Sequence, residues 1–446
     1  YFLTSLYWIT ISLTFDSNFE FLIPIALILV PTFLALFYGL ATFCFFKINL
    51  KKPVSNLFLF SLLFGLIEFI RGNILSGFPW NLFAYSFSNN LEILQIISLI
   101  GTYAFNILCI SFFISPAILI LRENRKEMIV CIFFLLSPIA LYIFGASKIK
   151  FFQSINLTKN DYTIRAIGSK IDLKRFYGST DAHSVIKELI DLSEPNLNTK
   201  MIFIWREGII PNIDQSELKD FEFLFNQKFN ENHLIGLGIN NYKKIENNEN
   251  YFNSFSFFDH KLNLIKTYNK VNLVPFGEFL PLERILRRIG LKSLTNNYQS
   301  FTSGEKRNIV TIDKNNFNIK ILPLICYEII YSGQIFDNTN FDYIINISED
   351  GWFGDSIGPY QHFAHSIFRS IESGKYLVRS SNNGITAIIN PIGNIEKKIE
   401  LGNSGYIDFF EKRVSDTTMF SQHGNKMFLT IILLYIFLIL SFNRIS

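Results

Sequence analysis

Long apolar runs without charged residues constrain this chain most, because they gather toward its two ends instead of spreading evenly. They cover residues 1–15, 21–46, 54–67, 93–121, 128–147 and 427–443. A helix needs roughly 20 apolar residues to cross the hydrocarbon core of a bilayer, and tilt or interfacial residues relax that number. We therefore predict five membrane helices and interpret the first, shorter run as the remnant of another.

Composition and charge divide the chain into three parts. At 446 residues and 49% hydrophobic, with a mean hydropathy of +0.26, the chain is too apolar for an ordinary soluble protein. Most charged residues lie between 148 and 426, and the net charge of +4 is too weak and scattered to indicate nucleic-acid binding. We predict a helix bundle over 1–147, a polar domain over 148–426 and a C-terminal membrane helix over 427–446.

Two of the connections between the apolar runs are basic, which predicts how the chain is oriented. They contain Lys47, Lys51 and Lys52 in one case and Arg122, Arg125 and Lys126 in the other. If both connections are cytoplasmic by the positive-inside rule, alternation of the helices places the polar domain on the opposite face of the membrane. Arg444, after the last run, then lies on the cytoplasmic side as well.

The connection at residues 68–86 is rich in glycine and in aromatic residues around Phe78, Pro79 and Trp80. One interpretation is an interfacial loop that belongs to an aromatic belt. The other is a lipid-facing or re-entrant element that lines a substrate entry. Composition is compatible with both.

The polar domain alternates strand-like and helix-like segments. Strands are predicted at residues 163–167, 201–205, 234–239, 252–258, 319–325, 343–347 and 385–390. Helices are predicted at residues 182–192, 215–225 and 360–374. Such alternation is typical of a layered α/β fold.

Three reactive side chains stand where strand-like segments stop or close to such a point. Glu207 follows MIFIWR, Lys270 lies in TYNKVNLVPFGEFLP, and Cys326 follows IKILPLI; the other three cysteines fall inside apolar runs. Each of these residues alone is usually structural. Together they form a complete set, because a carboxylate accepts the thiol proton, a cation lowers the thiol pKa from about 8.5 and stabilises an oxyanion, and the thiolate attacks a carbonyl.

Six stretches of the chain carry a resemblance to a known family. They are EFIRGNILSGFPW, WREGIIP, YNKVNLVPFGEFLPLE, ICYEII, DGWFGDSIGPYQH and SNNGITAIINPIG, in order between residues 68 and 393. With them the chain resembles the apolipoprotein N-acyltransferases, bacterial membrane enzymes with an outer domain of the nitrilase (carbon-nitrogen hydrolase) type. The resemblance implies an α/β fold in which a nitrilase-like αββα sandwich is inserted between the helices of a transmembrane bundle. It also implies that Glu207, Lys270 and Cys326 are the family's catalytic triad.

The resemblance further implies a two-step acyl transfer. Cys326 attacks the sn-1 ester of a membrane phospholipid and forms a thioester, with Glu207 as general base and with Lys270 and the Tyr327 backbone N–H holding the oxyanion. The α-amine of a lipoprotein's diacylglyceryl-cysteine then takes the acyl chain. The implied substrate-binding residues are Phe78, Pro79, Trp80, Trp352 and Phe353. The implied setting is a monomer in the bacterial inner membrane, with the catalytic domain on the periplasmic face.

Two further carboxylates, Glu278 in PFGE and Glu328 in CYE, match family positions. They either orient the triad or its cation, or simply form ion pairs with Lys270 or Arg379. Both readings are open at the level of sequence.

His362 and His365 are spaced i, i+3 on a predicted helix. Because no cysteine or carboxylate joins them at ligand spacing, we interpret them as satisfied or exposed helix histidines and predict no metal site. The chain has no phosphate-cradling glycine loop, and we predict no cofactor.

The chain departs from the family pattern at several positions. Arg206 stands where the family usually has Pro, Glu349 and Gly351 replace Asn and Ala, an expected Trp is missing near Arg175, and residues 168–170 lack the usual Gln. The family typically has eight membrane helices, and the first two have no counterpart, so the bundle is expected to be N-terminally incomplete. Two alternatives therefore stay open: a membrane-tethered nitrilase-type amidase acting on a small amide, and an inactive lipoprotein-binding remnant.

Overall fold

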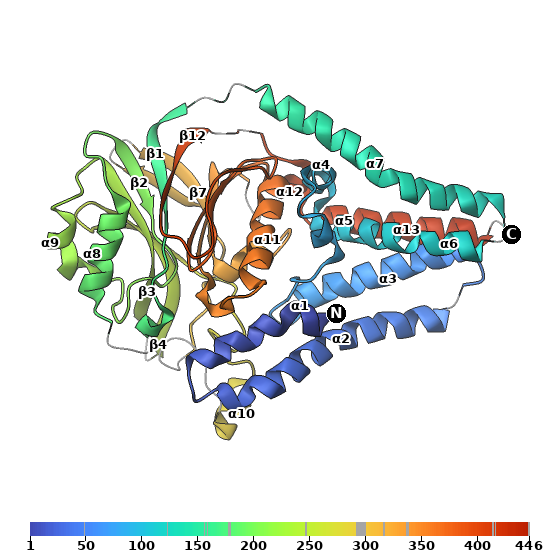
Figure 1. Cartoon of the computed structure of the whole chain (residues 1–446), viewed down its shortest axis with the longest axis horizontal. Coiled ribbons are helices and arrows are strands. Elements are labelled where there is room, and N and C mark those ends of the chain that lie inside the picture. The colour runs from blue at the N-terminus through green and yellow to red at the C-terminus, as the bar shows by residue number, and fades with distance from the viewer. Residues whose placement is uncertain are drawn as a thin grey trace.

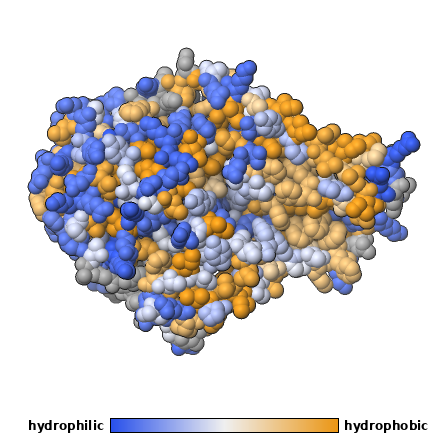
Figure 2. Space-filling view, viewed as in Figure 1, coloured by the Kyte–Doolittle hydropathy of each residue, from blue (hydrophilic) through white to orange (hydrophobic). Residues whose placement is uncertain are grey.

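The structure, a computed structural model, describes residues 1–444 except 49, 123, 156, 158, 177–179, 246–247, 291–299, 315–316, 336–338, 413 and 415. Long helices form one end of the molecule and two β-sheets form the other (Figure 1). Apolar side chains cover the helical end, whereas hydrophilic ones gather over the sheet end (Figure 2). The two halves of the molecule therefore differ in their surface as the composition predicts.

Five helices among the described residues are long and apolar enough to cross a membrane. They are α2 (Ile23–Ile48), α3 (Pro53–Asn73), α5 (Ile97–Ile114), α7 (Arg125–Gln153) and α13 (Lys426–Arg444). The first apolar run forms only the short helices α1 (Phe2–Leu6) and η1 (Tyr7–Phe15). The predicted five spanning helices and the short first run are both confirmed by length and composition.

The apolar run at 93–121 is not one helix. It lies in α4 (Leu91–Leu94), α5 and α6 (Pro116–Leu121), and Pro116 begins α6. Gly101 breaks α5 with a φ of 77°, and a Cβ there would lie 2.0 Å from the ring of Phe420. Glycine is required at position 101 for two reasons. A positive φ costs conformational free energy for a residue with a side chain, and the ring of Phe420 leaves no room for a Cβ.

Two six-stranded sheets make up the polar domain. The first has the order β12-β1-β2-β3-β4-β5 and the second the order β11-β10-β9-β8-β7-β6. The strands of the first are β1 (Lys159–Gly168), β2 (Lys200–Ile204), β3 (His233–Ile245), β4 (Asn248–Asp259), β5 (Leu264–Asn269) and β12 (Gly405–Lys412). Those of the second are β6 (Val310–Lys314), β7 (Phe317–Ile325), β8 (Tyr343–Glu349), β9 (Tyr376–Asn382), β10 (Thr386–Ile389) and β11 (Ile395–Ile399). All seven predicted strands are present, and five were missed.

Alternation along the strands stacks the sheets into a sandwich. In β2, Ile202 and Ile204 pack into the core shared with the second sheet, whereas Met201 and Phe203 pack outward against α8 (Ala182–Ser193). On the far side of the second sheet lies α11 (Gly358–Ser373). A strand presents successive side chains to opposite faces. Each sheet therefore packs against the other sheet with one face and against helices with the other face. The predicted αββα fold is confirmed, although the helix expected at 215–225 is only η5 (Glu217–Phe221) and α9 (Glu222–Phe225).

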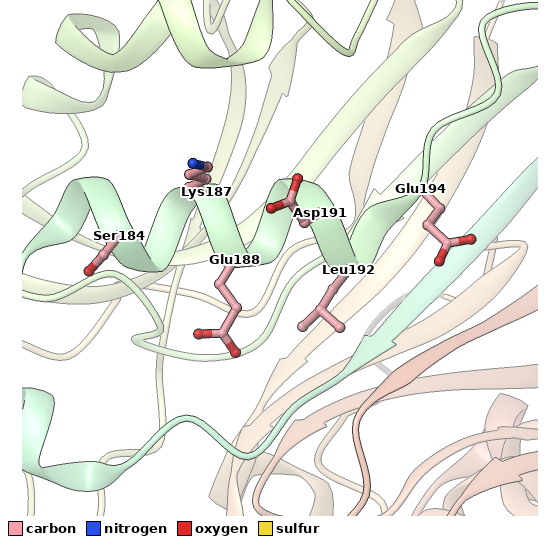
Figure 3. A pocket seen from close by; sticks show the side chains of 6 residues that line it. All are labelled: Ser184, Lys187, Glu188, Asp191, Leu192 and Glu194. Atoms are coloured by element: carbon pink, nitrogen blue, oxygen red, sulfur yellow. The ribbon is translucent and has the colours of Figure 1, made fainter.

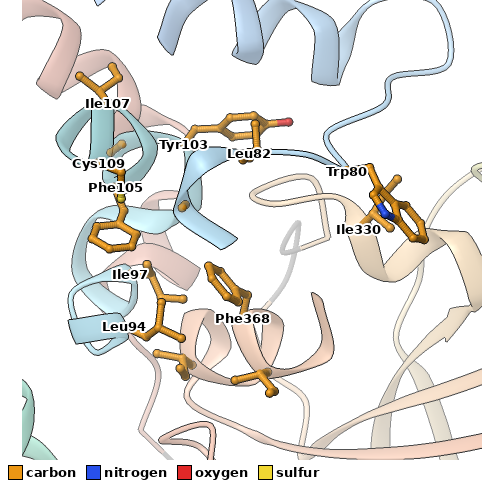
Figure 4. Packing of buried hydrophobic residues seen from close by; sticks show 14 of the residues in the cluster. Trp80, Leu82, Leu94, Ile97, Tyr103, Phe105, Ile107, Cys109, Ile330 and Phe368 are labelled. Carbon is orange, nitrogen blue, oxygen red and sulfur yellow. The ribbon is translucent and has the colours of Figure 1, made fainter. Parts of the chain in front are cut away.

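The hydrophobic core continues from the sandwich into the helix bundle. Ile330 lies in the short helix directly after β7, Phe368 lies on α11, and both belong to one buried cluster with Phe105 and Ile107 of α5 (Figure 4). Trp80, from the connection after α3, packs into the same cluster. A shared core of this kind fixes the position of the membrane helices relative to the sandwich.

Candidate active site

Cys326 lies directly after β7, as the first residue of the short helix η8 (Cys326–Ile330). Its φ is +46°, a left-handed backbone that is unfavourable for a residue with a side chain. Only 8% of the residue is exposed. The predicted thiol at a strand end is therefore present, and it sits on a strained turn.

Lys270 is held between two carboxylates. Its Nζ lies 2.9 Å from Glu207 Oε1 and 3.0 Å from Glu278 Oε1, and the lysine is 1% exposed. Asn253 Nδ2 donates to the same two oxygens at 2.7 Å each. The backbone N–H of Glu349 donates to Glu207 Oε2 at 3.1 Å. Glu207 and Lys270, 63 residues apart in sequence, are thus fixed against one another.

The charges of this cluster reach the thiol. Burial raises the pKa of Cys326 well above its ordinary value, and the charge of Glu207 raises it further, whereas Lys270 and a hydrogen bond with Ser348 lower it. Burial disfavours the Lys270 ammonium, but the charges of Glu207 and Glu278 outweigh it and raise the pKa of the lysine. Burial also raises the pKa of Glu278 against the opposing effect of Lys270. Glu207, Lys270 and Cys326 therefore form one buried electrostatic unit.

Glu328 organises the backbone around the thiol. Its Oε2 accepts from the Ile325 N–H at 2.9 Å, and its Oε1 accepts from the Val271 N–H at 2.9 Å and lies 3.2 Å from Arg307 Nη2. It therefore ties the turn of Cys326 to the segment after Lys270. Of the ion pairs considered from sequence, Glu278 with Lys270 is present.

Arg379 is not the partner of Glu278 or Glu328 that the sequence allowed. Arg379 is paired with Asp350, at 2.7 Å, and Glu328 is paired with Arg307. The sequence could not show which arginine pairs with which carboxylate, because both pairs join segments that are distant along the chain.

The five expected substrate-binding residues fall into two groups. Phe78 stacks on Trp80 with ring centroids 5.9 Å apart, and Trp80 lies 5.7 Å from Phe353. Pro79 lies in the same loop, close to Gly72 of α3. Trp352 instead stacks on Phe176 at 5.6 Å.

The loop that carries Trp80 is tied to the residue after the thiol. The Tyr327 hydroxyl donates to Gly77 O at 2.8 Å. Trp80 itself is 3% exposed, and its Nε1 donates to Gln361 on α11 at 2.8 Å. Residues 68–73 are the last turns of α3, and the loop that follows them within the connection at 68–86 is packed against the sandwich next to η8.

The departures from the family pattern form one cluster. Arg175 forms a buried ion pair with Glu349, whose Oε2 also accepts from Asn382 at 2.7 Å and whose Oε1 accepts from the Gly351 N–H at 2.9 Å. Arg206 is fully buried nearby, and its guanidinium has no hydrogen-bond partner among the described residues. Burial and the charge of Arg175 lower the pKa of Arg206 to about 9. Residues that look like unrelated substitutions in the sequence therefore interact in space.

Sequence reasoning missed Asn253, which bridges the two carboxylates, and the role of His362. His362 is fully buried, with Nδ1 2.9 Å from Asp350 Oδ1 and Nε2 3.2 Å from Cys326 O. The interpretation as a satisfied helix histidine is confirmed for His362. It is wrong for His365, which is 1% exposed and whose Nδ1 has no hydrogen-bond partner among the described residues. Polar residues inside an apolar strand such as β4 were the available signal for Asn253.

A surface pocket lies elsewhere on the molecule. It is formed along α8 by Ser184, Lys187, Glu188, Asp191, Leu192 and Glu194 (Figure 3). None of the predicted site residues lines it, so we assign it no part in the chemistry. The described residues contain no group of three or more His, Cys, Asp or Glu that could hold a metal ion.

Solved structures of the nitrilase superfamily are similar to part of the chain. A variant of an amidase from Nesterenkonia AN1 has a TM-score of 0.40 and 9% identity, covering 61% of this chain and 97% of its own. Nit3 of Saccharomyces cerevisiae has a TM-score of 0.38 and 13% identity, covering 57% and 90%.

Sequence comparison defines the class to which the sandwich belongs. The family described as carbon-nitrogen hydrolase matches residues 216–407, and that described as apolipoprotein N-acyltransferase N-terminal domain matches residues 1–114. The molecule thus combines a carbon-nitrogen hydrolase sandwich with membrane helices.

Curated relatives make the assignment particular. Apolipoprotein N-acyltransferase of Rickettsia prowazekii is 34% identical over 95% of this chain and 84% of its own length. The enzymes of that name from Rickettsia bellii (32%, 99% and 86%) and Brucella melitensis (29%, 92% and 77%) are similar too. The chain belongs to the apolipoprotein N-acyltransferase family.

Proposed function

We propose that this chain is an N-acyltransferase that moves an acyl chain from a membrane phospholipid to a lipoprotein. The Cys326 thiolate attacks the sn-1 ester carbonyl, a C–S bond forms, and the ester C–O bond breaks. The proton taken by Glu207 leaves with the lysophospholipid, and the Lys270 ammonium stabilises the oxyanion together with the Tyr327 N–H. The α-amine of the acceptor's diacylglyceryl-cysteine then attacks the thioester carbonyl and forms an amide bond. Glu207 takes the proton of the amine, the C–S bond breaks, and that proton passes to the Cys326 sulfur to restore the thiol.

The setting of Lys270 next to the Cys326 thiol is the observation that supports this proposal most. A buried lysine between two carboxylates acts electrostatically on a buried thiol at a strained strand end. The lysine charge is permanent in that setting because the pKa of Lys270 is raised. A fixed cation next to a nucleophile stabilises the negative charge that develops on an attacked carbonyl oxygen.

The packing favours a lipid substrate over a small soluble amide. The residue after the thiol contacts the connection at 68–86 through the Tyr327 hydroxyl, and that connection links the membrane helix α3 to α4. We propose that Phe78, Pro79, Trp80, Trp352 and Phe353 border the path of the acyl chain. A water-soluble substrate does not require such a contact with membrane helices.

We further propose a multi-pass protein of the bacterial inner membrane that acts as a monomer, with the sandwich on the periplasmic face. The C-terminal ends of α2 and α13 lie at the end of the molecule opposite the sheets (Figure 1). This arrangement fits basic connections on the cytoplasmic side. The proposed division is 1–147, 148–426 and 427–446, although α7 continues through the first boundary to Gln153.

The experiment is to follow label from a phospholipid through the protein. The chain in membranes or nanodiscs is incubated with a phospholipid carrying a labelled sn-1 acyl chain, and Cys326 is examined by peptide mass spectrometry. We expect label on Cys326 that hydroxylamine removes, and transfer of that label to a diacylglyceryl-cysteine peptide when it is added. Cys326→Ser should carry no thioester.

Two outcomes contradict the proposal. Absence of label on wild-type protein, with Cys326 intact, indicates the inactive remnant. Label that passes to water but never to the peptide amine indicates a hydrolase of the amidase type. The buried pair of Arg175 and Glu349 argues against a remnant, because two departures from the family pattern compensate one another.

A further inference from the structure

The left-handed backbone of Cys326 needs neighbours that hold it. A non-glycine residue at φ +46° is strained and persists only where the surrounding structure over-determines it. Glu328 secures the N-terminal side of the turn through the Ile325 N–H. On the other side, the carbonyl oxygen of Cys326 itself lies 3.2 Å from His362 Nε2.

The neighbours of His362 fix which ring nitrogen donates to Cys326. A backbone carbonyl oxygen only accepts hydrogen bonds, so Nε2 carries a proton whenever this contact is made. Burial lowers the pKa of His362, so the ring is neutral, and Nδ1 is then an acceptor for Arg379 Nη2 at 3.1 Å. Asp350 Oδ1, which accepts from the same guanidinium, lies 2.9 Å from Nδ1. Asp350 is in turn hydrogen-bonded by Ser348 at 2.6 Å, so the imidazole ring cannot turn without breaking a buried network.

Two aromatic rings hold the imidazole in place, Trp80 from the connection after α3 and Phe353 from the segment directly after β8. Trp80 stacks on His362 with ring centroids 5.5 Å apart and an interplanar angle of 20°, and Phe353 lies edge-on at 5.3 Å. Neither Trp80 nor His362 is exposed by more than 3%. The ring is therefore fixed between the loop at 68–86 and the turn that carries the thiol.

We propose that His362 is a positioning residue, which donates from Nε2 to the carbonyl oxygen of Cys326 and so holds the strained turn that aims the thiol at Glu207 and Lys270. His362 does not take up or release a proton in the reaction. It links the aromatic loop at 68–86 to the nucleophile by a rigid contact. The effect of His362 on thioester formation rests on the proposed acyl transfer. The contact between His362 Nε2 and the carbonyl oxygen of Cys326 does not depend on that proposal.

Two amide variants separate the two ring nitrogens. The amide of His362→Gln reaches the place of Nε2 and retains a donor toward Cys326 O. The amide of His362→Asn reaches only the place of Nδ1, so its oxygen can still accept from Arg379, but the donor to Cys326 is lost. We expect thioester formation to stay within about tenfold of wild type in His362→Gln and to fall about 100-fold in His362→Asn, with KM for phospholipid unchanged.

A second readout does not depend on the substrate. The rate at which iodoacetamide alkylates Cys326 is followed on the Cys326 peptide. It should be highest in the wild type, lower in His362→Gln and lowest in His362→Asn. Thermal denaturation identifies a variant that has not folded. If Cys326 shows this order while no variant forms a thioester, the positioning role holds and the proposed function fails.

His365 supplies a matched control. It lies on the same helix, is 1% exposed and contacts Trp80, but none of its described contacts reaches Cys326. The Asn and Gln variants of His365 should therefore react at equal rates. Equal rates for His362→Gln and His362→Asn, whether both high or both low in folded protein, or a faster Asn variant, would overturn the proposal.

Discussion

At the scale of single residues, Glu207 acts on Cys326 in two opposing ways. As the proposed general base it takes the thiol proton, yet its negative charge raises the pKa of the same thiol. Lys270 offsets that charge, since its Nζ lies 2.9 Å from Glu207 Oε1. The resting cysteine is therefore held as a thiol, and its proton moves only when the substrate carbonyl is present to take the attack.

Glu207→Gln should separate these two effects. Alkylation of Cys326 should become faster, because removing the neighbouring negative charge lowers the pKa of the thiol and increases the thiolate fraction at a given pH. Thioester formation from phospholipid should fall by about 10²–10⁴-fold, because the base is lost. Iodoacetamide kinetics and labelled phospholipid measure the two rates.

The pH profile and a control complete this experiment. Because the pKa of Cys326 is raised, its alkylation rate in the wild type should still increase with pH beyond about 8.5. Glu283→Gln, which removes a half-exposed carboxylate paired with Arg287, should change neither rate. Slower alkylation in Glu207→Gln would contradict the electrostatic coupling.

At the scale of elements, the broken helix α5 is capped from the sandwich. Thr102, the residue after the break at Gly101, donates its N–H to Glu372 Oε1 on α11 at 2.8 Å and its hydroxyl at 2.6 Å. Glu372 also accepts from Ser332 at 2.6 Å and pairs with Arg369. A carboxylate at a helix N-terminus accepts hydrogen bonds from the free N–H groups there and is attracted by the positive end of the helix dipole. The membrane helix α5 therefore depends on the sandwich for its N-terminal cap.

Glu372→Ala should destabilise the whole molecule. It leaves the buried Arg369 without its carboxylate and Thr102 and Ser332 without their acceptor, which costs about 3–5 kcal/mol of unfolding free energy. Glu372→Gln keeps an acceptor and should cost less. The midpoint of thermal denaturation in detergent measures both.

An exposed ion pair gives the matched control. Glu400 pairs with Lys398 on the surface, and Glu400→Ala should shift the unfolding free energy by no more than about 0.5 kcal/mol. Equal denaturation midpoints for Glu372→Ala and Glu400→Ala would show that the cap contributes nothing.

At the scale of the whole molecule, the helices and the sandwich share one core, and this restricts how the molecule sits in a membrane. On the face that Figure 2 shows, apolar surface is concentrated at the helical end, whereas hydrophilic side chains gather over the sheet end. The C-terminal ends of α2 and α13 lie at the end of the molecule opposite the sheets (Figure 1). The proposed orientation therefore places Lys51 on the cytoplasmic side and Lys187 of α8 on the other.

Labelling of single cysteines tests this orientation. Lys187→Cys and Lys51→Cys, both at exposed positions, are made in a chain whose own cysteines are replaced by Ala. A membrane-impermeant maleimide should label Lys187→Cys in intact spheroplasts and Lys51→Cys only after lysis. The reverse pattern would overturn the orientation.

The candidate nucleophile could be identified from sequence more easily than the residues that surround it. Cys326 was identifiable because a thiol follows an apolar strand outside the apolar runs, and β7 ends there. β9 was missed because Arg379, Ser380, Ser381 and Asn382 read as polar surface. These side chains are fully buried and hydrogen-bonded, since they support the site instead of facing water.

The sequence by itself determined the membrane helices and a layered α/β fold, because the distribution of apolar residues and local periodicity are recorded directly in the order of residues. The αββα class and the grouping of Glu207, Lys270 and Cys326 followed from the chemistry of these side chains and from the resemblance of six stretches to a known family. Only the tertiary structure decided that Glu349 pairs with Arg175, that Asn253 bridges two carboxylates and that His362 holds the carbonyl oxygen of Cys326. Such contacts depend on distances between residues far apart in the chain, and packing in three dimensions is what sets those distances.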